Sequence, residues 1–320
     1  MGTNVTMTEK KPIIEMKNLS RWYGEVLGVN RISATVQPGI TGLLGPNGAG
    51  KSTLMNLICG LLRPSQGAAL VFGEQIWNNP RPLRSLGYCT QYDTFYEGLS
   101  AFEFLYSLLS LRGYDRASTR RLAIEALERV NLQDVMNKRL ASYSKGMRQR
   151  VKVALALADN PDILVLDEPL NGLDAVGRYD MIELIKSYGK EGRNVLISSH
   201  ILHEIESMTD NILMLSNGYL LAEGDVREVR SLLKQHPHRI YLRTSEPRRF
   251  ASLLFAQDGI LSVELDQDGE GLVAQTYDLD AFYINLNKIV LEQGIHVSLA
   301  TISDESIQAV FKYLSGNNHD

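Results

Sequence analysis

The segment 45–52 has the residue types and spacing of a loop that binds phosphate groups. It reads GPNGAGKS, which matches the pattern G-x-x-x-x-G-K-[ST], and it lies between an apolar run and a segment with helical spacing. Glycines let backbone amides wrap around phosphates, and the N-terminus of the following helix favours negative charge. The Lys51 ammonium suits the β- and γ-phosphates of a nucleotide, and the Ser52 hydroxyl suits Mg²⁺. The residues predicted to bind nucleotide here are Gly45, Asn47, Gly48, Gly50, Lys51, Ser52 and Thr53.

Two carboxylates end the apolar segment 163–168, which reads ILVLDE. Four apolar residues followed by acids are typical of a buried parallel strand that carries its acids to the ligand-binding edge of a sheet. Asp167 is suited to holding Mg²⁺ through water, and Glu168 is suited to taking a proton from an attacking water molecule. These residues therefore predict hydrolysis of a bound nucleotide.

Apolar runs that alternate with helix-length segments must position these residues. This alternation predicts an α/β fold with a mostly parallel sheet covered by helices. The runs are 40–44, 86–90, 163–167, 195–198 and 212–216. Between the second and third runs the chain has no strand pattern, and three stretches with helical spacing predict an inserted helical subdomain. These stretches are 102–111, 119–130 and 145–158.

A second unit is predicted after a helix at about 226–235, because the residues His236-Pro237-His238 stop the helical pattern. Its elements alternate in the order βαββαβα, which favours a small α+β domain of the ferredoxin-like kind. They are a strand at 239–244, a helix at 247–256, strands at 261–265 and 271–276, a helix at 279–293, a strand at 296–302 and a helix at 304–314. The predicted organisation is an extension at 1–11 and domains at 12–235 and 236–320.

Composition and charge exclude several classes of protein. The 320 residues are 44% hydrophobic and 22% charged, as in folded domains, and no apolar run reaches the 18 residues of a membrane span. The longest, at 151–158, is broken by Lys152. Residues 236–320 hold 6 Lys/Arg against 12 Asp/Glu, and no basic stripe favours a nucleic acid partner. Residues 1–16 lack the apolar core of a secretion signal, so we expect the chain to stay in the cytoplasm, with Cys59 and Cys89 as buried thiols.

Together these residues resemble the nucleotide-binding subunit of an ATP-binding cassette (ABC) transporter, over roughly residues 12–235. The resemblance implies a P-loop NTPase core with a parallel sheet, an antiparallel β subdomain and a helical subdomain at about 92–160. It also implies ATP and Mg²⁺ as ligands. Tyr23 matches the aromatic residue that such proteins stack on adenine, with Trp22 as a nearby competitor. A core aromatic remains the alternative for this position.

Three further resemblances concern the reaction and the metal. Gln91 matches the glutamine that reaches Mg²⁺ and the attacking water, alongside Ser52 and Asp167 as the other metal-binding residues. His200 resembles the histidine that contacts the γ-phosphate and helps to hold the water activated by Glu168. His203, by contrast, is interpreted as a solvated helix residue.

The segment 143–150, YSKGMRQR, occupies the place of the family signature, usually Leu-Ser-Gly-Gly-Gln. Ser144 and Gly146 are kept, and the resemblance implies that they face the γ-phosphate bound by a second subunit. Lys145 and Met147 replace glycine and glutamine. Asp174 ends a segment that resembles the loop crossing to the partner. We therefore expect a head-to-tail dimer with a second copy or a homologous ATPase.

The same resemblance implies a second kind of partner, an integral membrane permease. The chain would then work at the cytoplasmic face of the membrane, held there by the permease, whose short helix would enter a cleft around 92–105. The Ser-Lys-Gly-Met signature and the tail ending at 306–314 resemble two-component drug and lipid exporters. The tail equally fits a role in stabilising the dimer.

Two other functions are weighed against transport. A soluble ABC ATPase of DNA repair, chromosomes or the ribosome would show long coiled coils, zinc cysteines or two cassettes in one chain, and the sequence has none of these. A regulator that binds ATP without turnover would not need Glu168 and His200, and both are present. No residue of the sequence indicates which substrate is transported.

Overall fold

The computed structural model describes residues 11–227, 237–266, 269 and 271–302. The chain divides into two compact units, Met1–Gly224 and Asp225–Asp320. The domain boundary predicted after Gln235 lies outside the described residues, as does most of the helix predicted at 226–235. Each unit is therefore described by itself.

The central sheet of the first unit has the strand order β10-β9-β3-β8-β7-β6. Its strands are β3 (Ile40–Leu44), β6 (Leu86–Cys89), β7 (Ile163–Leu166), β8 (Asn194–Ser199), β9 (Asn211–Ser216) and β10 (Tyr219–Asp225). The strands from β9 to β6 pair in parallel, so the five predicted runs form one sheet, as expected. Strand β10 was not predicted. It follows β9 after Asn217 and Gly218, whose φ angles of 49° and 81° suit a two-residue hairpin turn.

A second, antiparallel sheet has the order β2-β1-β4-β5. Its strands are β1 (Ile14–Tyr23), β2 (Val26–Val36), β4 (Gln66–Val71) and β5 (Glu74–Gln75). Strand β1 pairs antiparallel with both β2 and β4. The family resemblance predicted such a subdomain without placing its strands. The structure locates them on either side of the phosphate loop in the sequence.

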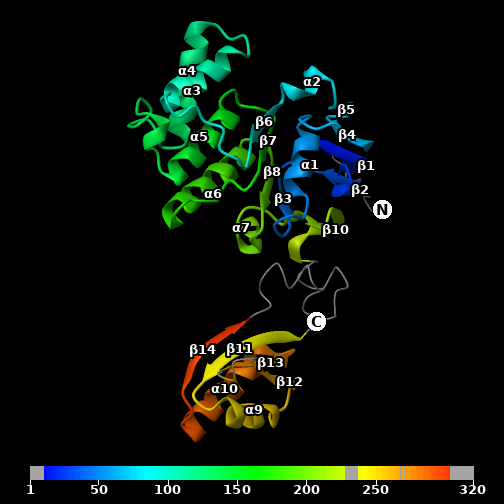
Figure 1. Ribbon diagram of the computed structural model, residues 1–320, viewed down its shortest axis with the longest axis vertical. Coiled ribbons are helices and arrows are strands. Elements are labelled where there is room, and N and C mark those ends of the chain that lie inside the picture. The colour runs from blue at the N-terminus through cyan, green and yellow to red at the C-terminus, as the bar shows by residue number, and fades with distance from the viewer. Residues whose placement is uncertain (1–10, 228–236, 267–268, 270, 303–320) are drawn as a thin grey trace, which may run out of the picture. The chain divides into compact units, whose positions relative to one another are not determined.

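Helix α1 (Lys51–Ile58) packs between the two sheets. Its side chains Leu54 and Met55 are fully buried in one apolar cluster with Ile14 of the antiparallel sheet and Leu213 of the central sheet. Figure 1 shows α5 (Lys145–Leu157) and α6 (Ala175–Lys190) on the other side of the central sheet. Burial of apolar area on both faces of the sheet holds the start of α1 against the end of β3.

The predicted helical insertion lies between β6 and β7. It contains α3 (Ala101–Ser110), α4 (Arg116–Arg129), the 3₁₀ turn η1 (Leu140–Ser142) and α5 (Lys145–Leu157). Each α-helix begins at a side chain that caps its backbone amides, and these caps are Ser100, Asp115 and Ser144. Short helices α2 (Pro80–Leu83) and α7 (Leu202–Glu206) lie elsewhere in the unit. In the described part of the chain, no helix is both long and apolar enough to cross a membrane.

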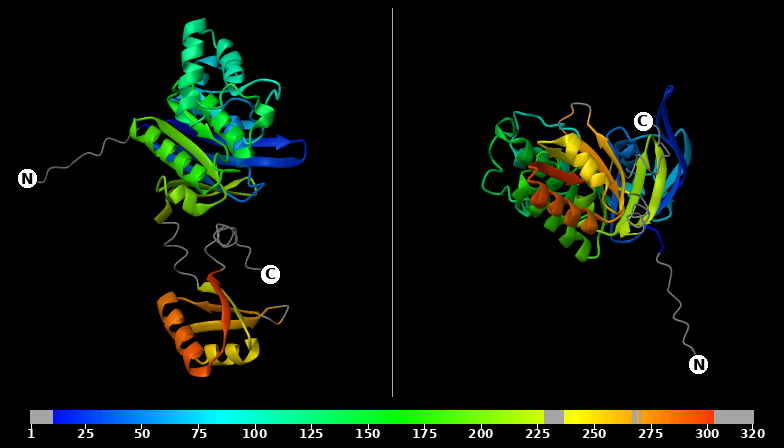
Figure 2. Two further views of the ribbon diagram at one scale, coloured as in Figure 1. Left: turned by 90° about the vertical axis from the view of Figure 1, so that its left-hand side faces the viewer. Right: turned by 90° about the horizontal axis from the view of Figure 1, so that it is seen from below.

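The second unit is a four-stranded antiparallel sheet with the order β12-β13-β11-β14. Its elements are β11 (His238–Thr244), α9 (Pro247–Phe255), β12 (Ile260–Leu265), β13 (Gly271–Thr276), α10 (Leu279–Gln293) and β14 (Val297–Ile302). Phe250 of α9 and Phe282 of α10 share a core with Ile240 and Leu242 of β11, so both helices cover the same face (Figure 2). This is the ferredoxin-like arrangement. The helix predicted at 304–314 lies outside the described residues.

Candidate functional site

The phosphate loop joins the end of β3 to the start of α1. Gly48 and Gly50 have φ angles of 81° and 101°, which glycine adopts without strain. A Cβ atom at Gly50 would lie 2.5 Å from the carbonyl oxygen of Gly28, so this position also needs glycine for space. No side chain caps the first turn of α1, and that turn contains no acidic residue. Its backbone N–H groups are therefore placed to bind an anion.

The Lys51 side chain curls back over this loop. Its Nζ atom donates to the carbonyl oxygens of Gly45 at 2.7 Å and Pro46 at 3.3 Å, and lies 3.1 Å from Glu168 Oε1. Lys51 is 6% exposed and Glu168 is 5% exposed. A buried ammonium paired in this way is already neutralised, so an entering phosphate must compete with Glu168 for it.

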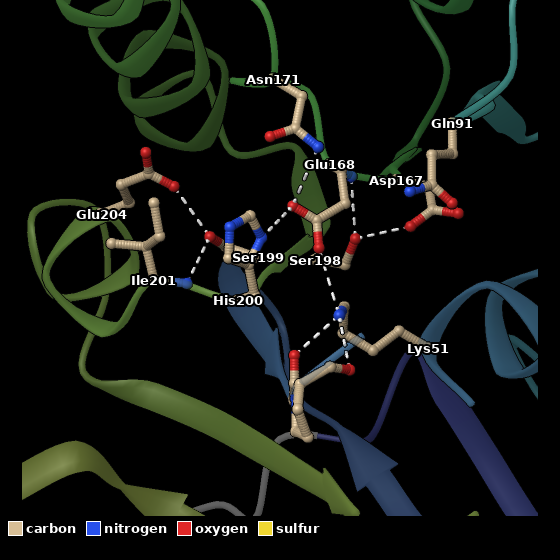
Figure 3. Close-up of polar contacts among 12 residues, drawn as sticks. Lys51, Gln91, Asp167, Glu168, Asn171, Ser198, Ser199, His200, Ile201 and Glu204 are labelled. Atoms are coloured by element: carbon tan, nitrogen blue, oxygen red, sulfur yellow. Dashed lines mark hydrogen bonds and ion pairs between the residues drawn. The ribbon is translucent and has the colours of Figure 1, made fainter. Parts of the chain in front are cut away.

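Ser198 of β8 joins the two acidic residues that follow β7 (Figure 3). Its hydroxyl donates to Asp167 Oδ1 at 2.7 Å and accepts from the backbone N–H of Glu168 at 2.8 Å. Glu168 has a φ of 51°, a left-handed conformation that costs energy in a non-glycine residue. Burial raises the pKa of Asp167 above its ordinary value, and the hydrogen bond from Ser198 opposes that rise.

The residues near Asp167 fit a magnesium ion. Asp167 Oδ2 is buried and has no hydrogen-bond partner among the described residues. The Ser52 hydroxyl lies 3.4 Å from Gln91 Oε1, so a hydroxyl and an amide oxygen are available beside the carboxylate. These are the hard oxygen ligands that Mg²⁺ prefers. The described residues form no cluster of three His, Cys, Asp or Glu side chains suited to a metal.

His200 lies directly after β8 and contacts the second carboxylate oxygen of Glu168. Its Nδ1 atom is 2.9 Å from Glu168 Oε2, and Asn171 Nδ2 donates to the same oxygen at 3.4 Å. The turn behind His200 is held by Ser199, whose hydroxyl donates to Glu204 at 2.8 Å and accepts from the N–H of Ile201 at 3.0 Å. The Glu168 carboxylate is thus held by three side chains (Figure 3). His203 is exposed on α7, as predicted.

Tyr23 lies at the end of β1, beside the start of α1. It is 43% exposed, and its hydroxyl is 3.5 Å from Thr53 Oγ1. A Cβ atom at Gly28 would lie 2.9 Å from both side chains, so this glycine permits their approach. The Arg21 guanidinium lies 4.9 Å from the centre of the Tyr23 ring. Trp22 is 41% exposed. The ring of Tyr23 is therefore a surface group next to the phosphate loop.

Ser144, Gly146 and Asp174 lie at the starts of two helices. Ser144 accepts from the N–H of Met147 at 3.2 Å and caps α5, and Asp174 accepts from the N–H of Gly177 at 2.9 Å and caps α6. Both caps are exposed. Within the described chain, no hydrogen bond joins Ser144, Gly146 or Asp174 to Lys51, Ser52 or Glu168.

The two helix starts lie next to each other. A Cβ atom at Gly146 would lie 3.1 Å from the carbonyl oxygen of Gly172, and one at Gly172 would lie 2.8 Å from the Lys145 side chain. The lysine that replaces the usual signature glycine therefore packs against the loop that leads to Asp174. That packing ties the signature to the neighbouring loop of the same chain.

The sequence reasoning missed three residues of this site. Ser198 contacts the Asp167 carboxylate, and Asn171 contacts the Glu168 carboxylate. Lys152 contacts the carbonyl oxygen of Gln91. Ser198 had one available signal, because it is a small polar residue at the end of an apolar strand run. Lys152 was visible only as a charge that breaks an apolar helix.

Comparisons with known proteins identify the family. The family described as ABC transporter matches residues 29–171. The chain is 34% identical over 308 residues to a bacitracin transport ATP-binding protein of Bacillus licheniformis, covering 95% of this chain and 97% of that protein. The chain belongs to the ABC transporter family. This ABC ATP-binding protein is also 31% identical to a daunorubicin/doxorubicin resistance ATP-binding protein of Streptomyces peucetius over 315 residues, 98% of this chain and 95% of that one.

Solved structures agree with this assignment. A bacterial ABC transporter cassette solved as a dimer is 25% identical with a TM-score of 0.62, covering 67% of this chain and 99% of that one. An ATP-binding subunit of an ABC transporter is 29% identical with a TM-score of 0.62, covering 69% of this chain and 93% of that one. The predicted P-loop NTPase fold is confirmed. As an ABC ATP-binding protein, the chain binds ATP and hydrolyses it.

Proposed function

We propose that this ABC ATPase powers export through a separate integral membrane permease, which it joins at the cytoplasmic face of the membrane. The names of two relatives support export as the direction of transport, because they refer to bacitracin transport and to daunorubicin/doxorubicin resistance. The names of these two relatives do not refer to DNA repair, chromosomes or the ribosome, so they do not favour the soluble alternative. The permease supplies the cargo pathway.

ATP binds at the phosphate loop. The α1 N-terminus and the Lys51 ammonium hold the phosphates, and Tyr23, beside Thr53, stacks on adenine. When bound, Mg²⁺ would supply positive charge beside the phosphates of ATP. Ser52 and Gln91 would hold this ion, and Asp167 would hold it partly through water. The buried Oδ2 atom of Asp167 has no hydrogen-bond partner among the described residues and is available for this role.

Glu168 is the general base. Its carboxylate is paired with Lys51, so the γ-phosphate must attract Lys51 before Oε1 becomes available to a water proton. His200 and Asn171 keep hold of Oε2, which fixes the orientation of the carboxylate while Oε1 is released. ATP binding thereby releases the general base that hydrolysis of the ATP requires.

Each complete site contains two chains. The observation that carries this proposal is the position of Ser144 and Gly146 at the exposed start of α5, without a hydrogen bond to the phosphate loop of their own chain. A hydroxyl and an amide at a helix N-terminus suit a phosphate. In a head-to-tail dimer they contact the γ-phosphate held by the partner, and Asp174 lies in the loop that crosses to it. Two ATP molecules then join the two subunits.

Mixing two inactive variants tests the composite site. Lys51→Ala disables the phosphate loop of its own chain, and Ser144→Arg places bulk and charge where the partner's γ-phosphate would lie. Each homodimer should be inactive. Random mixing should restore roughly a quarter of the sites, because half of the dimers are mixed and each mixed dimer has one intact site. ATP-dependent dimerisation is followed by light scattering in parallel. If mixing restores neither hydrolysis nor dimerisation, the head-to-tail site is refuted.

Purification from the native membrane tests the transport role. A polytopic membrane protein should co-purify with the chain and stimulate or regulate its ATPase activity after reconstitution. A chain recovered from cells with ribosomes or chromosomal DNA, and without a membrane protein, would support the soluble alternative instead.

A further inference from the structure

Helix α5 buries a charged residue that the ATPase mechanism above does not use. Lys152 is 7% exposed and lies in the middle of the helix, about two turns beyond Ser144. Burying an ammonium is unfavourable unless hydrogen bonds and an opposite charge compensate for it. A residue of this kind therefore depends on its partners, and the partners of Lys152 belong to the loop after β6.

Lys152 holds the backbone from which Gln91 projects. Its Nζ atom donates to the carbonyl oxygen of Gln91 at 2.9 Å and pairs with Asp93 Oδ1 at 3.0 Å. The Gln91 side chain itself is exposed, and its Oε1 atom lies 3.4 Å from the Ser52 hydroxyl. The carbonyl of Gln91 is thus fixed to α5, while its amide extends towards the proposed magnesium ligands.

The same helix also contacts the second catalytic loop. Gln149, one turn before Lys152, is buried, and its Nε2 atom lies 3.5 Å from the carbonyl oxygen of Glu168. A helix moves as a rod, so a displacement at its start reaches residues two turns later. Helix α5 therefore connects the exposed start at Ser144 with the backbone of both loops.

We propose, on the basis of the role proposed above for Gln91, that Lys152 is a positioning residue for catalysis. It places the Gln91 side chain by holding its backbone, and it makes that position depend on where α5 lies. When the partner's nucleotide draws Ser144 towards it, the movement of α5 carries the loop of Gln91 with it.

Lys152→Met tests this role because methionine keeps the apolar stem and removes the ammonium. We expect kcat for ATP hydrolysis to fall about 10-fold and the Mg²⁺ concentration for half-maximal activity to rise, as for other changes next to metal-binding residues. The KM for ATP should stay within about 2-fold, because Lys152 touches no predicted ATP contact. Lys186→Met is the matched control. Lys186 is a partly exposed lysine paired with Glu183 on α6, and its loss should leave kcat and the Mg²⁺ requirement unchanged.

A double-mutant cycle separates positioning from a structural role. If Lys152 acts through Gln91, Lys152→Met combined with Gln91→Ala should be about as active as Gln91→Ala alone. Lys152→Gln keeps one N–H donor without the charge, so its kcat should lie between those of Lys152→Met and wild type. If Lys152→Met does not fold, Lys152→Gln replaces it in the double-mutant cycle.

Three results overturn the inference. The first is a folded Lys152→Met or Lys152→Gln protein with wild-type kcat. The second is a double variant in which the loss of kcat equals the product of the losses in Lys152→Met and Gln91→Ala. The third is a lower melting temperature with an unchanged kcat and Mg²⁺ requirement. If Gln91→Ala itself retains wild-type activity, the proposed role of Gln91 fails together with this inference. If Gln91→Ala is impaired while Lys152→Met is not, only the role of Lys152 fails.

Discussion

Lys51 Nζ lies 3.1 Å from Glu168 Oε1, and both side chains are buried. The cation that is proposed to bind phosphate and the base that is proposed to activate water therefore neutralise each other. Arrival of a triphosphate replaces one anion beside Lys51 with another. Binding of ATP and release of the base are thus two consequences of one exchange of partners.

Glu168→Gln should separate these two consequences. Turnover should fall by roughly 10² to 10⁴ fold, because the amide keeps the shape of the side chain and cannot accept the proton. ATP should bind at least as tightly as to wild type, since Lys51 no longer has a carboxylate to leave. Single-turnover hydrolysis and equilibrium binding of ATP measure the two effects, and an ATP-bound dimer should accumulate. Turnover within a few-fold of wild type would remove Glu168 from the role of base.

Asp167→Asn should make the nucleotide-free protein more stable at neutral pH. Burial raises the pKa of Asp167 in the folded protein, so the folded state keeps this proton over a pH range in which the unfolded chain has lost it. The ionised carboxyl therefore opposes folding as the pH rises through the folded pKa. We expect the melting temperature of Asp167→Asn to exceed that of wild type by about 2–4 °C at pH 7 and to equal it at pH values below the unfolded pKa.

The same variant should lose the stabilisation that Mg-ATP gives to wild type, because Asp167 is one of the residues proposed to hold magnesium. Thermal unfolding at several pH values, with and without Mg-ATP, measures both effects. Asp258→Asn changes an exposed carboxylate and serves as the control. A variant that is less stable than wild type at pH 7 would contradict the assigned cost of burying Asp167.

Ser198→Ala should damage both stability and catalysis. It removes the hydroxyl that joins Asp167 to the backbone of Glu168, so we expect the free energy of unfolding to fall by about 1–3 kcal/mol. Turnover should fall at least about 10-fold, since the Asp167 carboxylate and the backbone N–H of Glu168 each lose a partner. Ser20→Ala is the matched control, because Ser20 is also buried and accepts a hydrogen bond from the backbone N–H of Arg31, but contacts neither Asp167 nor Glu168. Equal losses of turnover in both variants would show that Ser198 acts only through stability.

A chain ending at Gln235 should fold and bind ATP. The apolar core around α1 and the core of the second unit contain no residue in common, and all the predicted nucleotide contacts precede Gly224. Thermal unfolding should remain cooperative, with a melting temperature that rises on addition of Mg-ATP. An insoluble product, or one without a nucleotide-dependent shift, would show that the first unit needs the second.

Local sequence was sufficient to identify most of the chemistry. The loop at 45–52 and the acids after β7 are contiguous motifs, and their type and spacing state their chemistry without reference to distant residues. The five parallel strands could be predicted because strands buried on both faces are almost continuously apolar. Strands β1 and β2 could not be placed in the same way. They belong to a half-buried antiparallel sheet, and register shifts interrupt the alternation of β1 with β2.

Only the tertiary structure decided which of these residues meet. Ser198 reaches Asp167 and Glu168 because β8 lies next to β7, and this order of strands depends on pairing between segments far apart in the chain. Lys152 shows the same limit. The sequence marks it as a charge inside an apolar helix, but its partner is a backbone carbonyl 61 residues away, and no pattern of side chains encodes a backbone partner. Motifs specify chemistry locally, whereas packing between distant segments fixes the geometry in which that chemistry takes place.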